Sequence, residues 1–144
     1  MTYVDSSCLV KVFRREPGSD EVVAAISKEP MVVVSALTEL ETLIQLKGFH
    51  LAGEFTLPRW RLLETRLEIL RNQPPYVFRP LRASIFQTAL RQHRNSGEHH
   101  CRTVDRLHLA AMEELEVSRL MTHDDRQARA AQAAGFSVVM PGRD

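Results

Sequence analysis

The strongest constraint on the fold of this chain is the alternation of short apolar runs with longer segments of helical periodicity. Runs typical of buried strands stand at 2–4, 31–34, 119–122 and 137–141, and 76–80 is predicted to be an extended segment or an edge strand. Strands that alternate with helices are joined by crossovers into a largely parallel sheet. We therefore predict an α/β fold with a mainly parallel sheet of about four to five strands flanked by helices. The helices are expected at 6–15, 20–29, 37–48, 56–71, 81–95, 103–115 and 124–134.

Individual residues indicate where these helices begin and which face they bury. Ser19 and Thr56 are expected to cap the N-termini of the second and fourth helices. In the third helix, Leu40, Leu43 and Ile44 are expected to form the buried stripe.

The composition is that of an ordinary globular chain. At 144 residues it is long enough for one core, so we expect a single domain over 1–144. No run reaches the ~20 apolar residues of a membrane span, and the start lacks a secretion signal. We therefore expect the protein in the cytoplasm, with Cys8 and Cys101 as free thiols. The net charge of +1 indicates nothing for or against nucleic acid.

Four acidic residues each follow a short apolar run, namely Asp5, Glu41, Asp105 and Asp124. In an open α/β sheet, ligand crevices form at the carboxyl ends of the strands, so acids far apart in sequence converge there. Two carboxylates about 4 Å apart repel by roughly 4 kcal/mol at an effective dielectric constant near 20. A fold that gathers several carboxylates therefore needs a cation or shared protons. A bound divalent metal is the simplest account, and metal-assisted chemistry on a phosphodiester is its natural use.

The residues around these acids resemble the signatures of the PIN-domain family, and specifically of VapC-type toxin ribonucleases. The opening Tyr-Val-Asp-Ser-Ser-Cys-Leu-Val-Lys resembles the first signature, and Val-Ser-Ala-Leu-Thr-Glu-Leu-Glu resembles the second. Arg-Thr-Val-Asp-Arg-Leu-His-Leu-Ala-Ala resembles the third, and Leu-Met-Thr-His-Asp with Ala-Ala-Gly-Phe-Ser-Val-Val-Met-Pro resembles the fourth. Each signature alone is weak, but together they stand in order and cover essentially the whole chain.

This resemblance implies a three-layer α/β/α fold and a metal-dependent endoribonuclease that acts as the toxin of a toxin–antitoxin pair. It implies Asp5 as a direct ligand of Mg²⁺ or Mn²⁺, and Asp105 and Asp124 as direct or water-mediated ligands. It implies Glu41 as an outer ligand or as the group that positions the attacking water. Hard oxygen donors of this kind are the ligands that both ions prefer.

The resemblance also implies residues and partners around the acids. Ser6 and Thr122 match hydroxyl positions of the family and are expected to orient a carboxylate or a metal-bound water. Arg102 and Arg106 flank Asp105 and could contact phosphate. The implied partners are an RNA substrate, a small antitoxin that wraps the helices and occludes the acidic pocket, and a second copy in a homodimer.

Two of the acids have competing neighbours. Glu39 and Glu41 lie two positions apart on one helix, and counting six residues from Ser35, as the family pattern does, selects Glu41. Asp124 competes with Asp125, one being the expected helix cap and the other the ligand. The Thr-x-Asp spacing of the family favours Asp124 as the ligand.

Other functions remain as alternatives from the sequence alone. The chain could be a housekeeping PIN nuclease without an antitoxin, or a catalytically inactive PIN-like interaction module. A receiver domain would need a lysine at a late strand end, whereas all lysines stand in the first third of the chain. A haloacid-type phosphatase would need Asp-x-Asp at the first strand, where this chain has Asp-Ser-Ser. The run 98–101 contains zinc-ligand residue types but no second pair at zinc spacing, so a solvated loop is expected there.

Overall fold

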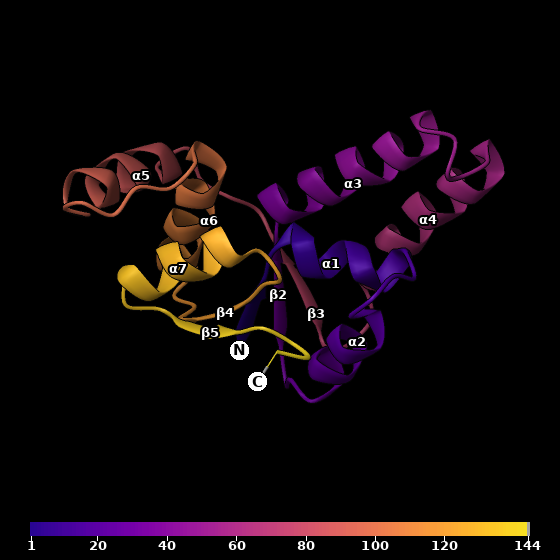
Figure 1. The fold of residues 1–144 in the computed structure, drawn as a ribbon, viewed down its shortest axis with the longest axis horizontal. Coiled ribbons are helices and arrows are strands. Elements are labelled where there is room, and N and C mark those ends of the chain that lie inside the picture. The colour runs from indigo at the N-terminus through magenta and orange to yellow at the C-terminus, as the bar shows by residue number, and fades with distance from the viewer. Residues whose placement is uncertain (144) are drawn as a thin grey trace.

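The computed structural model, which describes residues 1–143, contains a parallel sheet between two layers of helices (Figure 1). The sheet of the described chain has five strands in the order β3-β2-β1-β4-β5, so that β1 lies at its centre. All neighbouring strands pair in parallel. The strand bounds are β1 (Thr2–Val4), β2 (Val32–Ser35), β3 (Tyr76–Arg79), β4 (Arg119–Met121) and β5 (Ser137–Val139).

The strand order explains where a crevice forms. The chain runs outward from β1 through β2 to β3 and then returns across the sheet to β4 and β5 on the other side of β1. The order of the strands therefore reverses between β1 and β4, and ligands in open α/β sheets bind outside the carboxyl ends of the strands at such a point. Asp5 directly follows β1, and the loop 122–124 directly follows β4.

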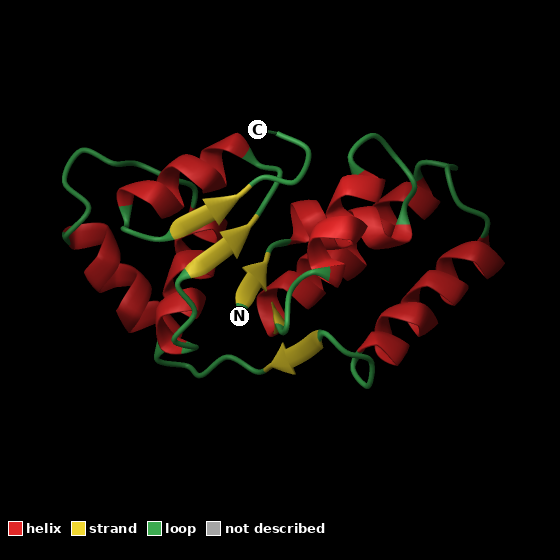
Figure 2. Cartoon of the chain, turned by 90° about the horizontal axis from the view of Figure 1, so that it is seen from below, coloured by secondary structure: helices red, strands yellow, loops and turns green. Residues whose placement is uncertain are grey.

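The helices form two groups, one on each face of the sheet. Figure 2 shows the strands between these groups. The group α1–α4 covers one face, and its helices are α1 (Ser6–Phe13), α2 (Ser19–Ser27), α3 (Ala36–Leu51) and α4 (Leu57–Leu70). The group α5–α7 covers the other face, with α5 (Ile85–Arg94), α6 (Thr103–Glu114) and α7 (Asp125–Ala133). The predicted three-layer α/β/α fold is therefore confirmed.

Alternation along the strands gives the sheet two cores. In β1, Tyr3 packs with α5 and α6 on one face, whereas Val4 packs with α1–α4 on the other. Leu120 and Met121 divide between the faces of β4 in the same way. A fully buried Val, Leu or Met side chain contributes ~1.5–3 kcal/mol to folding, so both faces stabilise the sheet that carries the crevice.

The predicted strands are confirmed to within two residues at each end, and 76–79 is an edge strand as expected. Thr56 caps α4 as predicted, because its side chain accepts a hydrogen bond from the Arg59 N–H. The predicted cap of α2 is wrong, since Gly18 occupies the N-cap position with φ of 89° and Ser19 is the first helical residue. A Cβ at residue 18 would lie 2.7 Å from Cε1 of His123, so close packing as well as φ favours glycine there.

The predicted buried face of α3 is wrong for two of its three residues, since only Leu43 packs against the core. Leu40 and Ile44 are 55% and 61% exposed, and the helix instead buries Thr38, Thr42 and Leu46. The two threonines can be buried because their hydroxyls donate to backbone carbonyls of Val4 and of Thr38 itself. Both cysteines of the described chain are free thiols, as expected, and none of its helices is long and apolar enough to cross a membrane.

Candidate active site

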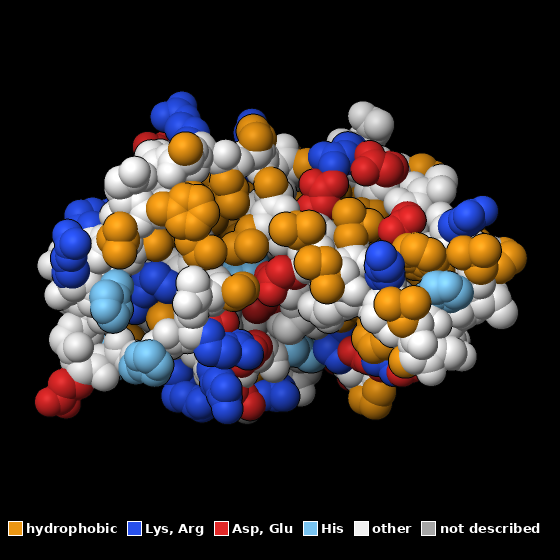
Figure 3. Space-filling view, turned by 90° about the horizontal axis from the view of Figure 1, so that it is seen from above, with side chains coloured by type: hydrophobic (Ala, Val, Ile, Leu, Met, Phe, Trp, Pro, Cys, Tyr) orange, Lys and Arg blue, Asp and Glu red, His pale blue; other side chains and the backbone are white. Residues whose placement is uncertain are grey.

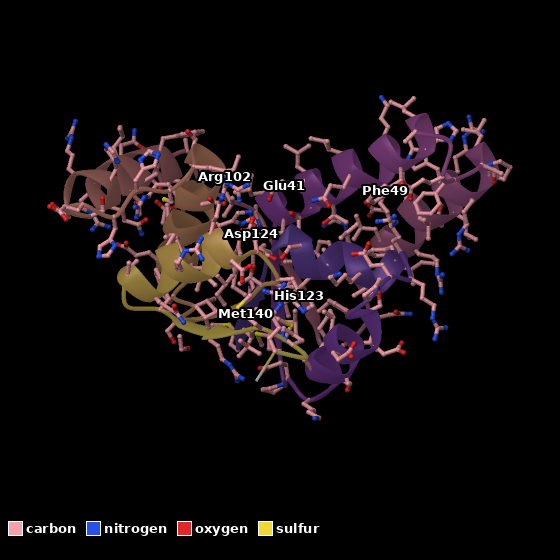
Figure 4. The ribbon with its side chains drawn as sticks, in the orientation of Figure 1. Glu41, Phe49, Arg102, His123, Asp124 and Met140 are labelled. Atoms are coloured by element: carbon pink, nitrogen blue, oxygen red, sulfur yellow. The ribbon has the colours of Figure 1, made fainter. Side chains whose placement is uncertain are left out.

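The predicted acids meet around one cavity at the reversal point of the sheet. This cavity of about 600 Å³ is lined by Asp5, Glu41, Asp105 and Asp124, which come from four different parts of the chain. Figure 4 shows Glu41 and Asp124 on the two sides of this region, with Arg102 nearby. The alternative acids, Glu39 and Asp125, do not line this cavity. Glu39 pairs with Arg71, and Asp125 pairs with Arg143.

Asp5 is the buried acid of the cavity. It caps the N-terminus of α1, where its Oδ1 accepts the N–H of Cys8 and the hydroxyl of Ser7. Its Oδ2 accepts the hydroxyl of Thr122. Burial raises the pKa of the Asp5 carboxyl, and these hydrogen bonds offset only part of that effect. A charge held in such a place costs stability and is typical of functional carboxylates.

The hydroxyls near Asp5 differ partly from the prediction. Thr122 contacts Asp5 as expected, and its Oγ1 also accepts the N–H of Asp124 at 3.0 Å, so it links two of the acids. Ser6 lines the cavity, but its hydroxyl accepts a hydrogen bond from Gln45 rather than contacting an acid. Ser7 takes the role expected of Ser6, donating to Asp5 at 2.6 Å and accepting the N–H of His123 at 2.8 Å. The only signal in the sequence was a second serine directly after the first.

Arg102 bridges the acids on the other side of the cavity. Its Nε and Nη2 donate to both oxygens of Asp105 at 2.8 and 2.9 Å, and Nη2 also reaches Oδ2 of Asp124 at 2.5 Å. Asp124 in turn caps α7, accepting the N–H groups of Arg126 and Gln127. Partial burial opposes ionisation of Asp124, but the hydrogen bonds from Arg102 and from these N–H groups hold the pKa of its carboxyl below its usual range.

Glu41 is held by a residue that the sequence did not single out. Its Oε1 lies 2.5 Å from Nε2 of His108, a buried residue of α6, and Nδ1 of His108 lies 2.7 Å from the hydroxyl of Tyr3. His108 stands three positions after Asp105 in the helix, so the two share a face and both point toward the cavity. That spacing is the signal by which His108 could have been found.

The donor set fits a hard divalent cation. Carboxylate oxygens are the ligands of Mg²⁺ and Mn²⁺, and the cavity supplies them from four residues. Within residues 1–143, no three carboxylate, imidazole or thiolate groups stand close enough to bind one ion together as they are arranged. The positive charge between Asp105 and Asp124 is the guanidinium of Arg102, so an ion bound by both would compete with that side chain.

A second, arginine-rich cavity adjoins the acidic one. It measures about 900 Å³ and shares Arg102 and Asp105 with its neighbour, and Figure 3 shows basic side chains gathered beside acidic ones on this face. Four further arginines line it. Arg91 pairs with Glu113, whereas Arg106, Arg126 and Arg129 have no ion-pair partner in the described chain. Nε of Arg106 is buried without a hydrogen-bond partner. This cavity is suited to a polyanion, since unpaired guanidinium groups bind phosphate.

Comparison with known proteins agrees with this geometry. Ribonuclease VapC46 of Mycobacterium tuberculosis is 30% identical over 141 residues, which cover 96% of each chain. The structure of M. tuberculosis VapC20, described as a sarcin–ricin-loop-cleaving toxin, superposes with a TM-score of 0.72 at 17% identity over 98% of this chain and all of the other. A toxin–antitoxin complex from Klebsiella pneumoniae superposes with a TM-score of 0.67 at 15% identity, with full coverage of both chains. The family model of the PIN domain matches residues 2–133. This chain, with its parallel sheet and its acids at the reversal of strand order, belongs to the PIN-domain family.

Proposed function

We propose that this protein is a metal-dependent endoribonuclease that acts in the cytoplasm as the toxin of a toxin–antitoxin pair, with residues 1–144 forming one domain. The observation that carries the proposal is the cavity lined by Asp5, Glu41, Asp105 and Asp124 at the reversal point of a PIN-type sheet. The name of its relative VapC46, a ribonuclease, supports the same activity.

The residues of the cavity divide into distinct roles. Asp5, Asp105 and Asp124 would hold Mg²⁺ or Mn²⁺, which when bound would lower the pKa of a water and neutralise charge on the scissile phosphate. Ser7 and Thr122 keep the carboxylate of Asp5 in one orientation. The remaining acid, Glu41, would orient the attacking water and accept its proton.

The arginine-lined cavity supports RNA as the substrate. Arg106, Arg126 and Arg129 offer guanidinium groups without acidic partners beside the acids, so a phosphate backbone bound there would bring the adjoining phosphodiester to the acidic cavity. Phosphate contacts of this kind fix the register of a nucleic acid without reading its bases.

Exposed apolar side chains support protein partners. Leu40 and Ile44 of α3 and Phe86 and Leu90 of α5 are exposed. Figure 3 shows hydrophobic side chains gathered on one face of the molecule. Such patches mark protein interfaces. We propose that this patch joins two copies in a homodimer, while a small antitoxin covers other helices and the acidic cavity. The toxin–antitoxin complex from K. pneumoniae has the same fold and supports an antitoxin partner.

The test is cleavage of total bacterial RNA by the purified protein with Mg²⁺, with Mn²⁺ and with a chelator, followed by sequencing of the new RNA ends. Cleavage with either ion is expected, and Asp5→Asn should abolish both cleavage and growth arrest on expression. Asp125→Asn is the matched control, because Asp125 does not line the cavity and pairs with Arg143. Its activity should equal that of the wild type.

Folding of the inactive variant must be checked in the same experiment. Because burial raises the pKa of Asp5, its charge is unfavourable in the folded state, and the Asn variant should melt at the wild-type temperature or above at neutral pH. Full cleavage by a folded Asp5→Asn protein would contradict the proposal. Cleavage without growth arrest would favour a housekeeping nuclease, and absence of divalent-metal binding would favour an inactive interaction module.

A further inference from the structure

A chain of short hydrogen bonds connects the core of the sheet to Glu41. The hydroxyl of Ser35 in β2 lies 2.6 Å from the hydroxyl of Tyr3 in β1, which lies 2.7 Å from Nδ1 of His108 in α6. Nε2 of His108 then lies 2.5 Å from Oε1 of Glu41 in α3. Tyr3, Ser35 and His108 are all buried, and Glu41 and His108 line the cavity.

With a neutral imidazole at His108, each of these hydrogen bonds has one direction. A carboxylate only accepts, so Nε2 of His108 must carry a hydrogen and donate it to Glu41. In the neutral ring Nδ1 then accepts from the hydroxyl of Tyr3, which in turn accepts from Ser35. The Ser35 oxygen also accepts the N–H of Thr38 at 3.1 Å, while the Thr38 hydroxyl donates to the carbonyl of Val4 at 2.9 Å. In this arrangement the hydroxyls of Ser35, Tyr3 and Thr38 each donate one hydrogen bond.

Glu41 needs such an anchor because its side chain is long and partly exposed. Fixing a free glutamate side chain costs up to about 2 kcal/mol of rotamer entropy, so without a partner its carboxylate would sample many positions. The imidazole of His108 is itself fixed by Tyr3, whose ring meets it edge to face with centroids 5.7 Å apart. The bond occupies Oε1, and Oε2 has no hydrogen-bond partner within residues 1–143, so it is free for a water.

We propose that Tyr3 and His108 are positioning residues of the nuclease, which act through Glu41 by holding its carboxylate in the orientation needed for the attacking water. The inference rests on the proposed function, in which Glu41 orients that water. The stability of the fold alone does not require a buried histidine that hydrogen-bonds Tyr3 and Glu41. An apolar residue at 108 would extend the buried face formed by Leu109 and Met112 without the cost of burying an imidazole.

The first experiment compares two variants of β1 that each remove a buried hydroxyl and keep the shape of the side chain. Tyr3→Phe breaks the chain two bonds away from Glu41, whereas Thr2→Val removes a hydrogen bond to Glu29 outside it. Removing a partner that orients an active-site ligand typically costs 10–100-fold, so Tyr3→Phe should lower kcat by about 10-fold with KM unchanged. Thr2→Val should change the melting temperature only. Both are measured with a fluorescent RNA oligonucleotide spanning a mapped cut.

The second experiment tests whether Tyr3 acts through Glu41. In a Glu41→Gln background, Tyr3→Phe should have no further effect on kcat, measured in single turnovers with enzyme in excess. His108→Gln, which can still donate to Glu41, should retain more activity than His108→Leu. In ¹⁵N spectra of the metal-free protein, Tyr3→Phe should shift the His108 ring nitrogens and Thr2→Val should not.

The outcomes separate this inference from the proposed function. A wild-type kcat in Tyr3→Phe would overturn the positioning role and leave the nuclease assignment intact. The same holds if the double variant loses kcat by the product of the two single losses. Equal activity of His108→Gln and His108→Leu would overturn it as well. Full activity in Glu41→Gln would overturn the role of Glu41 and this inference with it.

Discussion

At the scale of single residues, Arg102 shows how the site tolerates its own charge. The four carboxylates of the cavity repel one another, and the guanidinium between Asp105 and Asp124 is the cation within the chain that offsets this repulsion. The same atoms that Arg102 contacts are the oxygens expected to bind Mg²⁺ or Mn²⁺. Arg102 therefore both stabilises the metal-free protein and competes with the metal.

Arg102→Gln should consequently destabilise the metal-free protein and strengthen metal binding. Charge-assisted hydrogen bonds from a half-exposed arginine contribute about 1 kcal/mol after screening, so the free energy of unfolding should fall by about that amount. Loss of the same competition should tighten Mn²⁺ binding by about 5-fold, measured by calorimetry. The pKa of Asp124 is lowered, so the stability difference should be complete above pH ~4 and disappear as the pH falls through the folded-state pKa.

Arg119→Gln is the matched control for that prediction. Arg119 is 46% exposed and pairs with Glu29, whose side chain is 9% exposed. In the same way Arg102 is 51% exposed and pairs with the buried Asp105. Arg119 lies outside the acidic cavity, so Arg119→Gln should lower stability without changing the affinity for Mn²⁺. Unchanged Mn²⁺ affinity in Arg102→Gln would show that the guanidinium and the ion do not share ligands.

Single residues of the site were predictable where they carry charge at a strand end or match the family spacing, and not where they act through another side chain. Asp5 and Asp124 follow β1 and β4, whereas Glu41 in α3 and Asp105 in α6 followed from the family spacing alone, and the roles of all four stay predictions. Ser7, His108 and the bridging of two acids by Arg102 depend on which atoms face each other across α1, α3 and α6. No spacing in the sequence fixes such contacts.

At the scale of secondary structure, helix N-termini carry two of the acids. Asp5 caps α1 and Asp124 caps α7, so the first-turn N–H groups that need a partner also orient the carboxylates of the site. From the sequence, cap and ligand were alternative roles for Asp124 and Asp125. One carboxylate has two oxygens, and Asp124 uses Oδ1 for the cap and Oδ2 for Arg102.

This double role gives a prediction that separates folding from activity. Asn is as good an N-cap as Asp, whereas Ala costs about 1 kcal/mol at such a position. Asp124→Asn should therefore keep the cap, lose only the stability that its charge gains from Arg102, and lose nuclease activity. Asp124→Ala should lose activity and about 1 kcal/mol of stability as well, measured by chemical denaturation.

The control for the cap is the neighbouring residue. Asp125→Ala removes an exposed ion pair with Arg143 and should leave both activity and stability within about 0.5 kcal/mol of the wild type. If Asp124→Asn were as unstable as Asp124→Ala, the negative charge rather than the cap would be what α7 requires.

Helix faces were less predictable than helix positions. Apolar periodicity placed α3 correctly but selected Leu40 and Ile44 as buried, because it assumes that apolar residues face the core and threonines face water. The structure satisfies Thr38 and Thr42 with hydrogen bonds and leaves the two large side chains at the surface. Large apolar side chains that a folded monomer leaves exposed mark a surface for contact with another molecule.

At the scale of the whole molecule, the exposed faces of α3 and α5 should join two copies of the chain. Single exposed leucines are ordinary, but Leu40 and Ile44 of α3 and Phe86 and Leu90 of α5 are all more than half exposed, and Figure 3 shows hydrophobic side chains gathered on one face of the molecule. Buried aromatic and aliphatic anchors of an interface cost about 2 kcal/mol or more when removed. Ile44→Gln and Phe86→Gln should therefore each weaken a dimer by about 30-fold, measured by sedimentation over a concentration series.

Both side chains are largely exposed in the monomer, so neither change should lower its thermal stability by more than about 0.5 kcal/mol. Leu62→Gln, which removes an exposed apolar side chain from α4, is the matched control and should leave the dimer intact. A wild-type protein that sediments as a monomer at every concentration would contradict the homodimer. The dimer could instead persist in Ile44→Gln and Phe86→Gln and dissociate in Leu62→Gln. That result would place the interface on α4 rather than on α3 and α5, because only the residues at the centre of an interface contribute strongly to affinity.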